Sequence, residues 1–282
     1  MTSAVASFTN IPSADVKLAD YFKRIGFSSE FNPNFETLCD LHQLHTQSIP
    51  FENLNPLTGL PVQLDMGSIY EKLVYGGRGG YCFEHNMLFS SVLRSGGFRV
   101  QWLAARVMYN VPEGVIPPRG HMLLLINLGG KLFVDDVGFG GLTLPQPLLL
   151  EDGKEQKTTY ETFRLQRTDE EWTIEALLKD EWRPLYRFNL SEQLLPDYEV
   201  VNYYLSTHPR SHFTFTLIAA RMENGKRFNL RNLDLSIHER GVSEKSTVQS
   251  ANELRSLLND TFLINTTDID ISSIFQRLAS RS

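Results

Sequence analysis

The spacing of apolar residues predicts that the first hundred residues are mostly helical. Apolar side chains recur there at steps of three and four, which places them on one face of a helix. The predicted helices cover residues 16–25, 35–45 and 68–75, and a fourth begins at Cys82. Ser13 is the expected N-cap of the first helix, and Gly26 is expected to end it. Gly96 and Gly97 are expected to end the fourth.

From residue 98 onward the pattern changes to short runs rich in Val, Leu and Phe, separated by Pro and Gly. These runs predict strands of an antiparallel sheet or small barrel, over residues 100–107, 122–128, 131–134, 162–166 and 172–177. The charged, turn-rich segment 151–159 is expected to be an exposed loop. After about Val201 the pattern is mixed, with strands expected over 213–219, 227–230 and 234–238 and helices over 251–258 and 272–278. The whole pattern indicates an α+β fold.

Length and composition narrow the class of protein. With 282 residues the chain can bury a core and can form more than one domain. Its 27 basic and 33 acidic side chains give a formal charge of −6, so no nucleic-acid partner is expected. No run approaches the roughly 20 apolar residues of a membrane span, and residues 1–11 lack a signal-peptide pattern. We therefore expect a cytoplasmic protein without a membrane partner.

The candidate chemistry lies at Cys82, one of only two cysteines. Two cysteines are too few for a disulfide framework, so Cys39 and Cys82 are both expected to be thiols. Cys82 follows a glycine-rich turn and heads the fourth helix, where the unpaired N–H groups and the helix dipole favour a thiolate. His121 follows 39 residues later and Asp136 another 15, directly after Asp135. Cysteine, histidine and carboxylate are a nucleophile, its base and the group that orients the base.

Each of these residue types also occurs in proteins without a catalytic role. A free cysteine is most often an inert core residue, and a single histidine is usually satisfied in a core. The glycine-rich run at 138–141 lacks the Lys-Ser/Thr of a P-loop and is a weak nucleotide signal. His42 and His45 have a spacing that a metal could use, but the sequence supplies no further ligand pattern, so no metal is predicted.

The triad alone leaves several activities open. A papain-like peptidase places its histidine about 130 or more residues after the cysteine, which the observed interval of 39 excludes. The triad alone does not exclude a transglutaminase-like enzyme or another peptidase-like cysteine acyltransferase or hydrolase. A non-enzymatic binding module would be favoured if a triad residue were missing, and none is.

Four motifs make the chain resemble the arylamine N-acetyltransferases of the bacterial type. They lie at residues 50–54 (PFENL), 78–84 (RGGYCFE), 121–124 (HMLL) and 136–140 (DVGFG), with family-like intervals. The resemblance implies a Cys82, His121 and Asp136 triad in a cysteine-protease-like core. It also implies a helical domain over 1–97, a β-barrel domain over 98–200 and an α/β lid domain over 201–282.

The same resemblance implies a function and its partners. The activity would be acetyl transfer from acetyl-coenzyme A to an arylamine, arylhydrazine or N-hydroxyarylamine, through an acetyl-cysteine and without a metal. Phe51 and Phe139 match acceptor-pocket positions, and Tyr109, Gly140 and Thr143 match the coenzyme region. Oxyanion donors are expected at the Cys82 N–H and around Gly120.

Two further positions are noted on the strength of the resemblance. Glu52 and Arg78 match a buried ion pair that braces the loop before the nucleophile. His85 departs from the family pattern, because a glutamine or an apolar residue is expected there.

Overall fold

The computed structural model, which describes residues 16–239 and 241–281, begins with the predicted helices. The N-terminal helices are α1 (Leu18–Ile25), α2 (Phe35–Ser48), α3 (Leu54–Leu57), α4 (Met66–Ile69), which continues as a π-helix (Tyr70–Tyr75), and α5 (Cys82–Ser95). Gly26 ends α1 in the left-handed region with φ of 75°, and Gly96 follows the last residue of α5. The expected N-cap Ser13 lies outside the described residues.

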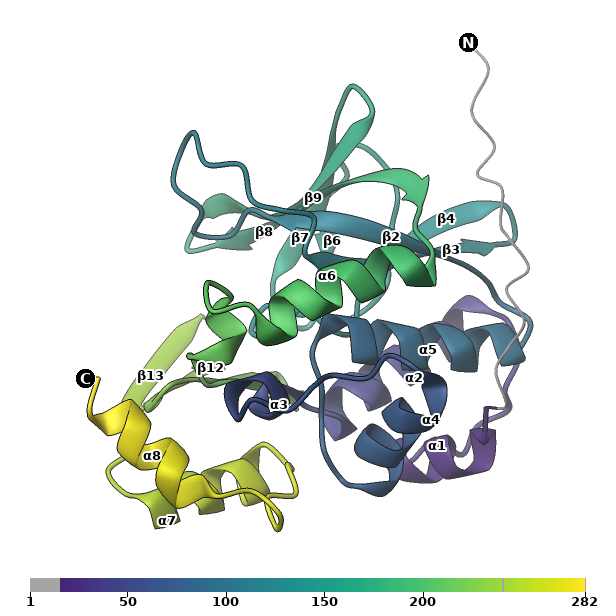
Figure 1. The fold of residues 1–282 in the computed structure, drawn as a ribbon. Coiled ribbons are helices and arrows are strands. Elements are labelled where there is room, and N and C mark those ends of the chain that lie inside the picture. Colours follow the sequence, from purple (N-terminus) through teal and green to yellow (C-terminus); the bar gives the residue numbers. More distant parts are fainter. Residues whose placement is uncertain (1–15, 240, 282) are drawn as a thin grey trace.

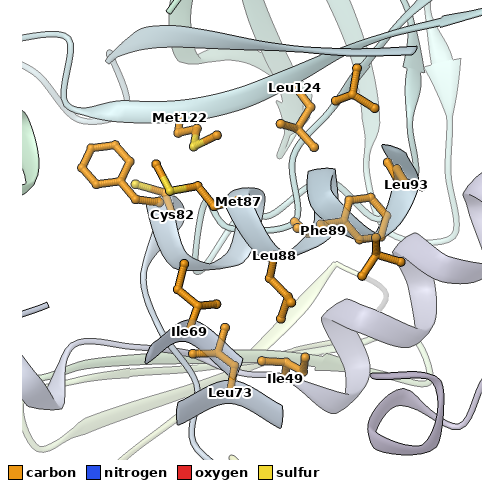
Figure 2. Packing of buried hydrophobic residues seen from close by; sticks show 14 of the residues in the cluster. Ile49, Ile69, Leu73, Cys82, Met87, Leu88, Phe89, Leu93, Met122 and Leu124 are labelled. Carbon is orange, nitrogen blue, oxygen red and sulfur yellow. The ribbon is translucent and has the colours of Figure 1, made fainter. Parts of the chain in front are cut away.

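Helix α5 forms the centre of the N-terminal part, and nearly all of its side chains are buried. Figure 2 shows Met122 and Leu124 on one side of this helix and Ile69 and Leu73 on the other. Burying each side chain of this size contributes roughly 1.5–3 kcal/mol to folding. The first residue of α5, Cys82, is therefore held on a helix that is fixed from both sides.

The second region is an antiparallel sheet of eight strands that curls into a nearly closed barrel (Figure 1). Its order is β5-β4-β3-β2-β9-β8-β7-β6. The strands are β2 (Arg99–Val107), β3 (His121–Leu128), β4 (Lys131–Asp135), β5 (Leu148–Leu149), β6 (Gln156–Lys157), β7 (Thr162–Thr168), β8 (Glu171–Leu178) and β9 (Glu181–Glu192). The five predicted strands are confirmed. The longest strand, β9, was not predicted, and the short β6 lies inside the segment expected to be a loop.

The C-terminal region contains a second antiparallel sheet and two helices packed on it (Figure 1). The chain enters it through α6 (Leu195–Thr207), which was not predicted, and a short 3₁₀ turn (His212–Thr214). The later elements are β10 (Ile218–Glu223), β11 (Lys226–Arg231), β12 (Asp234–Glu239), β13 (Val242–Thr247), α7 (Ala251–Ser256), which continues as a π-helix (Leu257–Thr261), and α8 (Ile271–Ala279).

The sheet of the C-terminal region has the order β1-β10-β11-β12-β13, so β1 (Phe51–Glu52) joins it from the N-terminal part. The expected strand over 213–219 is wrong in its first half, because that segment forms the 3₁₀ turn and β10 begins only at Ile218. The other two predicted strands and both helices are confirmed. The α+β class, with N-terminal helices, an antiparallel barrel and a C-terminal mixed region, is also confirmed. Within residues 16–239 and 241–281, none of the helices has the length and apolar character needed to cross a membrane.

Candidate active site

Cys82 is placed by a tight glycine turn at the start of α5. A Cβ atom on Gly79 would lie 1.9 Å from the carbonyl oxygen of Pro50, so only glycine fits there. The side chain of Glu84 reaches back and accepts a hydrogen bond of 3.0 Å from the backbone N–H of Tyr81. These contacts fix the backbone on both sides of the thiol.

The predicted ion pair before the nucleophile is confirmed. Arg78 Nη2 lies 2.7 Å from Glu52 Oε1, and the second Glu52 oxygen accepts from the Leu54 N–H at 2.6 Å. Burial alone would raise the pKa of Glu52, but the positive charges of Lys72 and Arg78 outweigh it and lower that pKa. Glu52 is therefore a charged brace between β1 and the loop that leads to Cys82.

His121, at the first position of β3, pairs with Asp136 just beyond the end of β4. His121 Nε2 lies 2.7 Å from Asp136 Oδ2, which leaves Nδ1 for the thiol of Cys82. Burial lowers the pKa of His121, but the Asp136 carboxylate and the hydrogen bonds to Asp136 and Cys82 outweigh it and raise that pKa to about 10. The imidazole is therefore positively charged at neutral pH.

The structure also shows how Asp136 is held. Its Oδ1 atom accepts hydrogen bonds from Asn86 Nδ2 at 3.0 Å and from the Gly138 N–H at 2.9 Å. Burial raises the pKa of Asp136, but His121 and these donors outweigh it and lower that pKa. The preceding residue, Asp135, points elsewhere and pairs with His42 at 2.6 Å. Successive side chains thus face opposite sides, as expected for a strand end.

A cleft of about 1520 Å³ opens beside the triad. Its walls include Cys82, His121 and four of the predicted binding residues, namely Phe51, Tyr109, Phe139 and Gly140. Phe139 packs edge-on against the His121 ring with centroids 5.1 Å apart. The fifth predicted residue, Thr143, is buried behind this wall, where its hydroxyl oxygen accepts from the Gly140 N–H at 2.8 Å. Four of the five predicted binding residues thus line the same cleft as the thiol.

Sequence reasoning missed two residues of this site. Asn86 binds the Cys82 carbonyl oxygen at 3.1 Å and the Met122 carbonyl oxygen at 2.9 Å in addition to Asp136. It lies four positions after Cys82, so helical spacing alone could have placed it on the same face. The ring of Tyr186 lies 4.9 Å from the His121 ring, and it belongs to β9, the strand that no pattern predicted.

A second glycine permits the close approach of the loop after Asp136 to the nucleophile. A Cβ atom on Gly138 would lie only 2.8 Å from the Cα atom of Cys82. The two backbones could not pack this closely with any other residue. Close packing against Cys82 therefore explains why a glycine stands at position 138 in the glycine-rich run after Asp136.

The structure also shows the surroundings of three other residues that the sequence singled out, Gly120, His85 and Cys39, and only those of Gly120 differ from the expectation. The Gly120 N–H donates to the Pro118 carbonyl at 2.9 Å, so it is already used and is not an oxyanion donor. His85 faces away from the thiol, because its Nε2 donates to the Pro50 carbonyl at 3.0 Å. Burial, followed by the charges of Asp135 and Asp40, raises the pKa of Cys39 to about 12, so this thiol is unreactive.

The two histidines with metal-like spacing have separate partners. His42 binds Asp135, whereas His45 Nε2 lies 2.9 Å from His85 Nδ1. Across residues 16–239 and 241–281, no group of three or more His, Cys, Asp or Glu side chains is arranged to hold a metal ion.

Fold and site together define a cysteine-dependent acyl-transfer class, in which a thiol, an imidazole and a carboxylate act in series beside an open cleft. Residues 34–271 match the sequence profile of a family described as N-acetyltransferase. The arylamine N-acetyltransferase of Mycobacterium tuberculosis is 40% identical over 256 residues, which cover 89% of this chain and 90% of that protein. The chain belongs to the arylamine N-acetyltransferase family.

Two further relatives support this placement. The Salmonella typhimurium protein named arylamine N-acetyltransferase / N-hydroxyarylamine O-acetyltransferase is 36% identical, over 88% of this chain and 89% of its own length. The structure of the Mycobacterium marinum arylamine N-acetyltransferase in complex with CoA has a TM-score of 0.90 and 38% identity, and the match covers 94% of this chain and 99% of that one. This family membership favours the acetyltransferase reading over the transglutaminase-like and non-enzymatic alternatives.

Proposed function

We propose that this chain transfers an acetyl group from acetyl-coenzyme A to aromatic amines, arylhydrazines or N-hydroxyarylamines. The observation that carries the proposal is the Cys82, His121 and Asp136 series beside an open cleft, in a chain of this family. Relatives named for arylamine N-acetylation and N-hydroxyarylamine O-acetylation, and a relative bound to CoA, support the substrates. An N-hydroxyarylamine would accept the acetyl group on oxygen.

The first half-reaction loads the enzyme. The Cys82 thiolate attacks the carbonyl carbon of the thioester, and the bond from that carbon to the coenzyme sulfur breaks. The departing thiolate takes the proton that His121 holds, because the Asp136 carboxylate keeps this imidazole charged at neutral pH. The products are acetyl-Cys82, free coenzyme A and a neutral His121.

The second half-reaction returns the enzyme to its first state. The amine attacks the acetyl carbon, its surplus proton passes to the neutral His121, and Cys82 leaves as a thiolate. We assign the oxyanion contact to the first N–H groups of α5, which point toward the developing negative charge at the helix start. No metal is needed for either step.

We assign acceptor binding to Phe51 and Phe139 and coenzyme binding to Tyr109 and Gly140, while the buried Thr143 serves the coenzyme region only by holding the backbone of Gly140 through its hydroxyl. A flat aromatic acceptor gains stacking and apolar contact between phenylalanine rings, which an alkyl amine lacks. Residues 1–97 would supply the nucleophile, 98–200 the histidine and carboxylate, and 201–282 a lid over the cleft. The lid assignment rests on residues of β11 and β12 that border the same cleft.

The test of this function is to incubate the purified protein with acetyl-coenzyme A alone. We expect one acetyl group on the intact protein, and peptide mapping should place it on Cys82. Cys39 serves as an internal control, because its raised pKa keeps it a thiol. A label on Cys39, or no label under conditions of turnover, would contradict the mechanism.

Replacing Phe139 by alanine should separate the two half-reactions. The acceptor KM should rise by about tenfold, because the lost ring removes roughly 1–1.5 kcal/mol of aromatic contact. Acetylation of Cys82 should change by less than about threefold, since Phe139 makes no hydrogen bond in the triad. Steady-state kinetics and single-turnover acetylation measure the two effects. Equal losses in both would show that Phe139 only supports the fold.

A further inference from the structure

A second His–Asp pair lies behind the active site and is not explained by the mechanism. His42 of α2 and Asp135 at the end of β4 are both fully buried. His42 Nδ1 lies 2.6 Å from Asp135 Oδ1, and its Nε2 lies 2.6 Å from the carbonyl oxygen of Leu144. Both ring nitrogens therefore face oxygen atoms at short hydrogen-bond distances.

The two partners of His42 are the two ends of one loop. Residues 136–143 run between Asp135 and Leu144, and they include Asp136 together with the cleft residues Phe139 and Gly140. One buried imidazole on a neighbouring helix thus contacts the chain just before and just after the segment that carries the catalytic carboxylate. We propose that His42 is a positioning residue of the active site, whose doubly protonated imidazole holds both ends of the loop 136–143.

The proton count follows from the partners. A carbonyl oxygen can only accept, so Nε2 of His42 must donate to Leu144. Nδ1 faces Asp135 Oδ1 at 2.6 Å. Burial lowers the pKa of His42, but the charge of Asp135 and the hydrogen bond to it outweigh burial and raise that pKa. We infer that Nδ1 donates to Asp135 as well, and an imidazole that donates from both nitrogens is an imidazolium. Asp135 Oδ2 is buried without a hydrogen-bond partner among the described residues, so the charge of His42 is its main compensation.

Two neighbouring histidines, His45 on the same helix and His85 on α5, show a different arrangement. Tyr21, His45 and His85 form a buried chain, with Tyr21 Oη 2.8 Å from His45 Nδ1 and His45 Nε2 2.9 Å from His85 Nδ1. This series of hydrogen bonds ends at the Pro50 carbonyl, which can only accept. Each imidazole ring therefore donates one hydrogen bond and accepts one, and both rings are neutral. His45 therefore offers a control that is equally buried and makes two hydrogen bonds, neither of which reaches the loop 136–143.

The proton count can be measured independently of activity. Two-bond ¹H–¹⁵N spectra of the protein labelled with ¹⁵N-histidine at pH 7.5 should show protons on both ring nitrogens of His42 and on one of His45. In Asp135→Asn, the new amide can donate to Nδ1, so His42 should lose the Nδ1 proton while keeping both hydrogen bonds. A single ring proton on His42 in the wild-type protein would overturn the proposal.

A graded series of variants tests the positioning role, which rests on the proposed function. His42→Asn keeps a donor near Nδ1 and loses the contact with Leu144, whereas His42→Gln keeps a donor near Nε2 and loses the contact with Asp135. Each should slow single-turnover acetylation of Cys82 by about tenfold, as expected for one lost hydrogen bond to a charged or buried group. His42→Phe loses both contacts and should slow it about 100-fold, the cost of moving a catalytic group by about 1 Å.

Two further measurements separate positioning from loss of folding. In the Asn and Gln variants the acceptor KM should also rise, because Phe139 lies on the same loop, while His45→Gln at similar stability should stay within about threefold of wild type. Asn and Gln variants with wild-type kinetics, or an equal loss in His45→Gln, would overturn the role. If the wild-type protein itself is not acetylated, the proposed function fails, whereas the proton count of His42 still stands or falls on its own.

Discussion

Asp136→Asn should slow the acetylation of Cys82 by about 10³- to 10⁴-fold, although the chain should still fold. The reason lies in the donors around the carboxylate. Asn86 Nδ2 and the Gly138 N–H both donate to Oδ1, so the carbonyl oxygen of an asparagine must take that position. Its amide nitrogen then faces His121 Nε2 and donates to it.

That reversed hydrogen bond puts the imidazole in the wrong tautomer. With Nε2 accepting, the ring proton moves to Nδ1, the nitrogen that faces Cys82. A protonated neutral Nδ1 cannot take the proton of the thiol, and without the carboxylate charge the raised pKa of His121 is lost. In serine proteases the corresponding change costs about 10⁴-fold.

The adjacent acid provides the matched control for this prediction. Asp135→Asn should stay within about tenfold of wild type, because Asp135 binds His42 and its amide can keep that hydrogen bond. Single-turnover acetylation followed by intact-protein mass spectrometry measures both variants, with circular dichroism to confirm folding. A larger loss for Asp135→Asn than for Asp136→Asn would reverse our assignment of the triad.

Local patterns in the sequence predicted a helix or strand correctly where its buried face consists of regularly spaced apolar residues. Helix α6 does not meet this condition. Its buried face mixes the apolar Tyr198 and Leu205 with the polar Asn202 and Ser206, and Val200 and Tyr203 are exposed. The apolar pattern of the helix is therefore weak. Asn202 is buried because it contacts the hydroxyl of Tyr81 and donates to the Val62 carbonyl at 2.9 Å.

Strand β9, which was not predicted, and the segment 213–219, where the predicted strand is largely wrong, differ from the prediction for related reasons. In β9 the pairing with β8 shifts between Ile174 and Glu175, and Pro184 lies within the strand, so regular alternation is interrupted. The segment 213–219 alternates like a strand, but Asn53 Nδ2 donates to the carbonyls of Phe213 and Thr216 and holds that backbone in a turn. A side chain 160 residues away in sequence is invisible to a local pattern.

The candidate site could be predicted only in part, because some of its contacts also join residues far apart in the sequence. Motif spacing was enough to nominate Cys82, His121 and Asp136, because family resemblance carries long-range information that periodicity lacks. The position of Asn86 beside the site could have been predicted from helical spacing, because it lies four residues after Cys82. The pairing of His42 with Asp135 joins residues 93 positions apart, and no spacing on α2 or β4 points to it. Buried polar contacts of this kind depend on the packed structure.

The protein should lose stability as the pH falls from about 6.5 toward 4, and a buried histidine, His85, is one of the causes. Its ring is fully buried and neutral, and an added proton on Nδ1 would face the N–H of His45. Burial lowers the pKa of His85 to about 4, and the charge of Lys72 adds to this effect. Burial and the neighbouring His85 also hold the pKa of His45 well below its ordinary value.

The sign follows from proton binding in the two states. Between about pH 4 and 6.5 the unfolded chain binds a proton at this histidine and the folded chain does not, so the free energy of unfolding falls with falling pH. The difference between the two pKa values corresponds to about 3 kcal/mol. His42 and His121 have raised pKa values, so their stabilising contributions are fully present below pH 6.5 and add no slope in this window.

His85→Gln tests this prediction, because glutamine keeps an amide donor for the Pro50 carbonyl but does not titrate. Urea unfolding at pH 6.5 and pH 4.5 should show a loss of stability that is smaller in His85→Gln than in wild type by about 2–3 kcal/mol. His208→Gln, which removes a partly exposed histidine outside the buried chain, should keep the wild-type loss. If wild type and His85→Gln lose equal stability between these pH values, His85 is not buried as a neutral ring, and the acid sensitivity comes from other groups such as His45 and Glu52.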